Sequence, residues 1–106
     1  MQVFGSRVRF SVYAPPQGMS FTEYAELWQM AERLGFDASY VTDHLVGLSQ
    51  PGGVQPTVFE GPTILSAMAT LTKRMRLGIN VVCNTFRNPA MVAKIAVTLD
   101  HVSNGR

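Results

Sequence analysis

The sequence predicts an α/β protein with a parallel sheet. Three strand-like segments alternate with three helix-like segments along the 106 residues, and the strands recur about every 30 to 40 residues. Each helix-like segment also begins with residues that favour a helix start. This alternation favours parallel strands joined by right-handed crossovers. The pattern by itself leaves open a doubly wound sheet or part of a (β/α)8 barrel.

The first strand is predicted at residues 7–13, where polar and apolar residues alternate. Ser20 and Glu23 then form a capping-box pattern at the start of a helix. Gly35 is placed to end this helix in a left-handed conformation. The apolar stripe of the helix comprises Phe21, Tyr24, Trp28, Ala31 and Leu34.

A second strand is predicted at residues 38–42, before a long loop over residues 43–61 of the kind that often carries function. Pro62 suits the first turn of a second helix, which we expect to end near Lys73. The third strand, residues 77–82, is continuously apolar, as strands buried on both faces are. Asn88 and Pro89 begin a third helix. Its predicted inner face comprises Met91, Val92, Ile95, Leu99 and Val102.

Composition and charge exclude several classes of protein. The net charge of +2 and the scattered basic residues argue against nucleic acid or an anionic membrane as a partner. No run approaches the roughly 18 apolar residues that a membrane span needs. Cys83 is the sole cysteine, so we expect no disulfide and a reducing, cytoplasmic setting. The two histidines have no cluster of ligands around them, and we expect no metal site.

The turn after the first strand argues against a Rossmann dinucleotide site. It reads Ala14-Pro15-Pro16-Gln17-Gly18, without the spacing G-x-G-x-x-G that brings a backbone close to a pyrophosphate.

Three segments together resemble the luciferase-like oxidoreductases, which use flavin or the deazaflavin F420. They are FDASYVTDHL (36–45), RLGINV (76–81), and residues 85–106, which begin TFRNP and end LDHVSNGR. The resemblance implies that residues 1–106 are the N-terminal three βα units of a TIM barrel, a partial domain whose C-terminal remainder is missing. The family continues into a fourth strand and a Gly-rich phosphate-binding turn, so we expect no site here for the cofactor's phosphate end.

The same resemblance implies a site with FMN or F420 as cofactor and a small-molecule substrate. Asp43 and His44 match the family's Asp-His pair beside the reactive ring and are the expected catalytic residues. Asp43, Asn80, Val81, Cys83 and Asn84 are the expected cofactor-binding residues. A non-proline cis peptide in the relatives' third strand corresponds to the bond Asn80–Val81, and pairing of relatives through their second and third helices implies a homodimer.

One departure and several structural alternatives qualify this site. Some F420-dependent sugar dehydrogenases carry a glutamate where this chain has residues 14–17, which weakens the sugar-oxidising interpretation. Asp43 and His44 also fit a helix cap and a surface histidine, whereas His101 and Glu60 are expected to serve helix ends. Cys83 is expected to be packed or beside the cofactor rather than a catalytic thiol. Asn84 shares its loop and is explained equally well by loop structure.

Arg87 fits either an acidic neighbour or a ligand phosphate, and the sequence leaves this choice open. Two functions also remain. The first is an oxidoreductase or monooxygenase that transfers hydride or activates oxygen. The second is a non-catalytic barrel fragment that persists by self-association, because three parallel strands leave an unpaired edge and uncovered faces.

Overall fold

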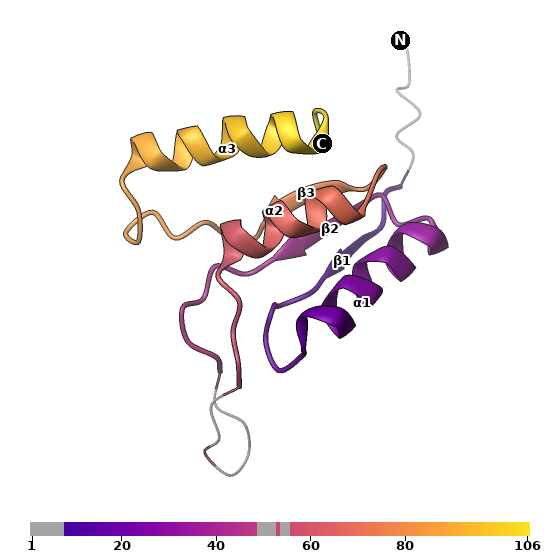
Figure 1. Ribbon diagram of the computed structural model, residues 1–106, viewed down its shortest axis with the longest axis horizontal. Coiled ribbons are helices and arrows are strands. Elements are labelled where there is room, and N and C mark those ends of the chain that lie inside the picture. The colour runs from indigo at the N-terminus through magenta and orange to yellow at the C-terminus, as the bar shows by residue number, and fades with distance from the viewer. Residues whose placement is uncertain (1–7, 49–52, 54–55) are drawn as a thin grey trace.

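The computed structural model describes residues 8–48, 53 and 56–106, and its elements follow the predicted order. They are β1 (Ser11–Tyr13), α1 (Phe21–Leu34), β2 (Ala38–Val41), α2 (Gly61–Leu71), β3 (Arg76–Ile79) and α3 (Pro89–Ser103). The strands form one parallel sheet in the order β1-β2-β3 (Figure 1). The predicted alternation and the parallel pairing are therefore confirmed.

Helix α1 begins with the predicted capping box. The Ser20 hydroxyl accepts a hydrogen bond from the Glu23 backbone N–H at 3.3 Å, and the Glu23 carboxylate accepts one from the Ser20 N–H at 2.8 Å. Gly35 ends the helix with a φ of 91°. The predicted apolar stripe is buried only at its centre: Tyr24, Trp28 and Ala31 are buried, whereas Phe21 and Leu34 are exposed.

Strand β3 is shorter and more exposed than the sequence predicts. It spans Arg76–Ile79 instead of residues 77–82, and none of its residues is fully buried. In the described part of the chain β3 is an edge strand of the sheet, as β1 is, because it pairs with β2 alone. The expectation of burial on both faces is therefore wrong. Strand β1 is also shorter than predicted, and Arg7 of that prediction lies outside the described residues.

The core lies between the sheet and helices α1 and α2. Tyr24 and Trp28 of α1, Met68 of α2 and Val41 of β2 are all completely buried. Full burial of an apolar side chain of this size contributes about 1.5–3 kcal/mol relative to exposure. These contacts hold the two helices on one face of the sheet.

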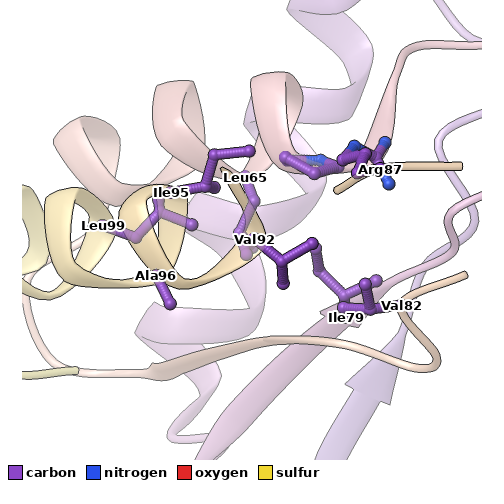
Figure 2. Close-up of a pocket in the computed structure, with 9 residues that line it drawn as sticks. Leu65, Ile79, Val82, Arg87, Val92, Ile95, Ala96 and Leu99 are labelled. Atoms are coloured by element: carbon purple, nitrogen blue, oxygen red, sulfur yellow. The ribbon is translucent and has the colours of Figure 1, made fainter. Parts of the chain in front are cut away.

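Helix α3 lies further from the sheet, beside α2 (Figure 1). Of its predicted inner face, Val92, Ile95 and Leu99 are half-buried, while Met91 and Val102 are 57% and 47% exposed. The prediction is thus right for the middle of the helix and wrong for its two ends. An apolar pocket of about 180 Å³ separates α3 from α2 and β3, with Arg87 at one end (Figure 2).

The amino-terminal edge of the sheet is held by Arg106. Its guanidinium donates five hydrogen bonds of 2.7–3.0 Å, whose acceptors are Ala69 O, Thr72 O, Thr72 Oγ1, Met75 O and Ser103 O. The carbonyls of Ala69 and Thr72 lie at the carboxyl end of α2, where the last carbonyls have no partner within the helix. The Arg106 carbonyl in turn accepts from the Leu77 N–H at 3.0 Å, which draws the end of α3 toward β3.

Candidate functional site

The loops that follow β2 and β3 meet at the carboxyl-terminal edge of the sheet. Val41 of β2 lies opposite Ile79 of β3, and the Asn80 N–H donates to the Val41 carbonyl at 2.8 Å. Asp43 and His44 follow β2 directly, and residues 80–87 follow β3. The register of the sheet therefore brings the predicted site residues to one edge, which is where parallel α/β enzymes place their chemistry.

Asp43 is the buried centre of this edge, with 3% of its surface exposed. Its Oδ2 accepts hydrogen bonds from Arg87 Nη1 at 2.5 Å and from the Cys83 N–H at 2.9 Å. Its Oδ1 accepts from Arg87 Nη2 at 2.8 Å. Such a two-pronged pairing is the strong form of an arginine–carboxylate contact. Asp43 therefore joins the end of β2 to the loop after β3.

Arg87 also forms an ion pair with Glu60. The Glu60 carboxylate accepts the Thr63 N–H at 2.8 Å and caps the amino end of α2, which confirms its expected place at a helix start. Of the two partners that the sequence leaves open for Arg87, the structure has the acidic one, and there are two acids. Their separations of 44 and 27 residues from Arg87 left no local pattern to indicate the pairing.

The electrostatics of this cluster keep both acids ionised. Burial raises the pKa of Asp43, but the Arg87 guanidinium and the Cys83 N–H outweigh it, so that the pKa lies below its usual range. For Glu60 the same balance holds, with burial opposed by hydrogen bonds from Thr63 and Arg87. Hydrogen bonds to Asp43 and Glu60 raise the pKa of Arg87 further above its usual value. The cluster thus has one cation shared by two anions at neutral pH.

Gly61 provides the space that this cluster needs. A Cβ at this position would lie 2.8 Å from the Thr42 carbonyl and 3.1 Å from Asp43 Oδ1. The first of these distances is shorter than any ordinary carbon–oxygen contact, and the carbonyl is backbone that cannot rotate away. Only glycine lets the start of α2 approach the end of β2 so closely. This role of Gly61 could not be predicted, because it depends on how α2 packs against the end of β2.

The remaining predicted site residues lie on the surface of the same edge. His44, Asn80 and Asn84 are exposed, and Val81 is 72% exposed. The peptide bond Asn80–Val81 is cis, as the family resemblance implied. An imidazole, two amides and an aliphatic side chain are thus exposed to solvent at this edge.

Cys83 is half-buried between these exposed residues and Asp43. Its Sγ lies 3.1 Å from Thr85 Oγ1, and this hydrogen bond, together with one from the Thr85 N–H, lowers the pKa of the thiol. The backbone of Cys83, rather than its sulfur, makes the contact with Asp43. This arrangement agrees with a packed cysteine whose main chain is anchored.

Exposed apolar side chains lie on the same two loops and are called the apolar rim below. Side chains from the loops after β2 and β3 are 39–75% exposed, although they are aliphatic or aromatic: Leu45, Val46, Leu48, Val81, Val82 and Phe86. Exposed apolar side chains that gather around a few polar groups are typical of a ligand site.

Two features are absent from the part of the chain that the structure describes: a cluster of metal ligands and a membrane-spanning helix. Across residues 8–48, 53 and 56–106, no three His, Cys, Asp or Glu side chains come together as metal ligands would. None of the described helices is long and apolar enough to cross a membrane.

Comparison with known proteins identifies relatives of this chain. The residue pattern of the family described as luciferase-like monooxygenase matches residues 4–106. An F420-dependent glucose-6-phosphate dehydrogenase of Amycolatopsis mediterranei is 38% identical over 77 residues, which are 72% of this chain and 22% of the relative. A limonene 1,2-monooxygenase of Rhodococcus erythropolis is 36% identical over 81 residues, 76% of this chain and 19% of the relative.

One solved structure has a fold similar to that of this chain. The coenzyme F420-dependent tetrahydromethanopterin reductase of Methanopyrus kandleri superposes with a TM-score of 0.78 at 26% identity. The matched region covers 95% of this chain and 26% of that enzyme. The fold is therefore that of the first three βα units of a TIM-barrel enzyme, and the chain spans about a quarter of the length of its relatives.

Proposed function

The chain belongs to the luciferase-like monooxygenase family, and we propose that its protein is an oxidoreductase that uses F420 or FMN on a small organic substrate. The observation that carries the proposal is the gathering of His44, Asn80, Val81 and Asn84 at one strand edge, around the buried Asp43. The relatives named above include both a dehydrogenase and a monooxygenase. Hydride transfer and oxygen activation are accordingly the two reaction types.

The residues at this edge suit the flat ring of a flavin or deazaflavin. Val81 and the aliphatic residues of the rim offer apolar surface to the face of such a ring. Asn80 and Asn84 carry amides that donate and accept hydrogen bonds at its polar edge. Cys83 lies between them and would line the same surface.

The described residues suit the phosphate end of these cofactors poorly. Arg87 is bound to Asp43 and Glu60, and the amino end of α2 is already capped by the Glu60 carboxylate. An anionic cap at this helix end opposes a phosphate there. The described part of the chain therefore holds the ring rather than the phosphates.

His44 is the residue to which we assign proton transfer. It is exposed on the loop after β2, and an imidazole is the side chain that most often serves as a general acid or base. Asp43 would orient its neighbours, since both of its carboxylate oxygens are occupied. When bound, F420 supplies hydride transfer, and reduced FMN supplies hydride transfer or activation of oxygen.

Association of two copies through α2 and α3 is part of the proposal. Met91 and Val102 are exposed on α3 and lie 11 residues apart, about three helical turns, so they share one face. An exposed apolar helix face favours burial against a second copy. The same surface supports the second candidate function, a non-catalytic fragment that persists by self-association.

The one thiol, Cys83, is free, which is typical of the reducing cytoplasm.

The test is titration of the full-length gene product with F420 and with FMN. We expect saturable binding of one cofactor, followed by turnover of reduced cofactor with an organic acceptor or oxygen. Binding of neither cofactor, combined with self-association, would leave the second candidate.

A further inference from the structure

We propose that Arg87 and Glu60 are positioning residues of this site, which act through Asp43 to hold His44 and the loop of Cys83 in a fixed relation. The expected effect on turnover rests on the proposed function. The expected effect on the geometry of the site does not, and a separate measurement tests it.

Asp43 is held by hydrogen bonds at its carboxylate group. Two hydrogen bonds from Arg87 and one from the Cys83 N–H engage both carboxylate oxygens. An anion held in this way is a poor proton acceptor, but it is a rigid link between two segments. The link joins the residue before His44 to the loop that carries Cys83 and Asn84.

The three charged side chains of this cluster are buried to different extents. The side chain of Asp43 is 1% exposed, that of Arg87 14% and that of Glu60 38%. A buried carboxylate needs a paired cation, and Arg87 is the cation that the structure provides. Glu60 accepts from the same Nη2 of Arg87 that donates to Asp43 Oδ1, so Arg87 cannot swing away from Asp43 without losing both acids.

Glu60 and Arg87 lie at the starts of two helices. Glu60 caps α2, and Arg87 directly precedes Asn88, whose side chain accepts the Ala90 N–H and caps α3. The cluster thus ties the starts of two helices to the end of β2. A shift of Arg87 would move the segments on both sides of the exposed site residues.

Arg87→Lys is the most informative variant, because lysine keeps the charge but cannot form the two-pronged contact. Glu60→Gln is the milder variant, since glutamine keeps an oxygen for the Thr63 N–H while the ion pair is lost. Arg106→Lys is the matched control. It replaces an arginine that also donates several side-chain hydrogen bonds, but at the opposite edge of the sheet.

Two measurements on the full-length gene product test the proposal. The first is the nuclear magnetic resonance signal of the Cys83 amide and of the His44 ring, which needs no cofactor. The second is the separate effect on kcat and KM. We expect Arg87→Lys to move both signals and to lower kcat about tenfold or more with a smaller change in KM. Glu60→Gln should change them in the same direction and to a lesser extent, and Arg106→Lys should leave them as in the wild type.

Unchanged signals and an unchanged kcat in Arg87→Lys would overturn the proposal. An equal loss in Arg87→Lys and Arg106→Lys would also overturn it, because the effect would then be one of general stability. If Arg87→Lys does not fold, Glu60→Gln decides by the same two measurements. If the wild type turns over neither cofactor, the proposed function fails, while the Cys83 and His44 signals still judge the positioning role.

Discussion

Arg87 and Asp43 are 44 residues apart in the sequence, and two hydrogen bonds of 2.5 and 2.8 Å join their side chains at the carboxyl-terminal edge of the sheet. This contact turns two separate loops into one surface. The exposed residues on either side of it, among them His44 and Asn84, owe their relative position to it. The predictions that follow test the site, the packing beneath it and the surfaces around it.

Replacement of His44 by alanine should lower the turnover of the full-length gene product by more than tenfold, because general acid–base catalysis by a placed side chain contributes about 10²–10⁴-fold. His101→Ala is the matched control, since His101 is also exposed but lies at the end of α3. Steady-state kinetics measure both. Equal activity of the His44 variant and the wild type would remove His44 from the mechanism.

Gly61→Ala should destabilise the protein by about 1–3 kcal/mol, the usual cost of forcing an extra group into a packed site. The new Cβ would meet the Thr42 carbonyl at 2.8 Å, and backbone must shift to accept it. Denaturant unfolding measures the difference. Thr70→Ala, an exposed change on the same helix, is expected to stay within about 0.5 kcal/mol of the wild type, and the same small effect for Gly61→Ala would contradict the close approach.

Acid should destabilise the fold through its paired carboxylates. The pKa values of Asp43, Glu60 and Glu32 lie below their ordinary values of 3.8, 4.5 and 4.5 in the folded chain. A group whose folded pKa is depressed stabilises the fold above its unfolded pKa, and this stability is lost as the pH falls through the folded pKa. Unfolding free energies measured from about pH 7 to about pH 3 should therefore decrease mainly below about pH 4.5.

Asp43→Asn should flatten part of that decrease, because one of the titrating acids is gone. Glu26→Gln, which removes an exposed carboxylate from α1, serves as the control for the loss of one acid. A slope that is the same in Asp43→Asn, Glu26→Gln and the wild type would show that Asp43 does not contribute to acid stability.

Arg106→Lys should lower the free energy of unfolding by roughly 2 kcal/mol, since hydrogen bonds to charged groups contribute about 1.5–3 kcal/mol each and a lysine recovers only part of them. Carbonyls of Ala69, Thr72 and Met75 lose donors in this variant. Thermal unfolding measures the loss. A melting temperature equal to that of the wild type would mean that water replaces these contacts without cost.

Met91→Glu should weaken self-association through α3. The position is 57% exposed and lies in the first turn, where a carboxylate is favourable for the helix, so folding should be retained. Sedimentation velocity compares this variant with Ala93→Glu, which puts the same charge on a different face of the helix. If Met91→Glu and Ala93→Glu associate equally, α3 is not the interface.

Local patterns predicted much of the fold. The capping box of Ser20 and Glu23 and the terminating Gly35 gave the bounds of α1, because these are contacts between residues close in sequence. The residues expected to form the site follow β2 and β3, and the parallel register brings these two segments to one edge of the sheet. The cis bond Asn80–Val81 followed from family resemblance alone.

Long-range contacts could not be predicted in the same way. The pairing of Arg87 with Asp43 and Glu60 depends on how three loops converge, and no spacing in the sequence encodes it. The burial of an apolar residue also depends on its neighbours in space. Met91 and Val102 have the helical spacing of a core face, yet both are exposed, and α3 packs mainly against α2 rather than against the sheet.

The most direct test of the central claim is a residue-by-residue map of cofactor binding by nuclear magnetic resonance. F420 and FMN are added in turn to the labelled full-length gene product, and the backbone and ring signals are followed. The account predicts that signals of His44, Asn80, Val81 and Asn84 shift with one of the two cofactors, while Arg106 at the opposite edge stays unchanged. Shifts confined to the apolar pocket between α2 and α3, or no saturable shifts with either cofactor, would contradict it.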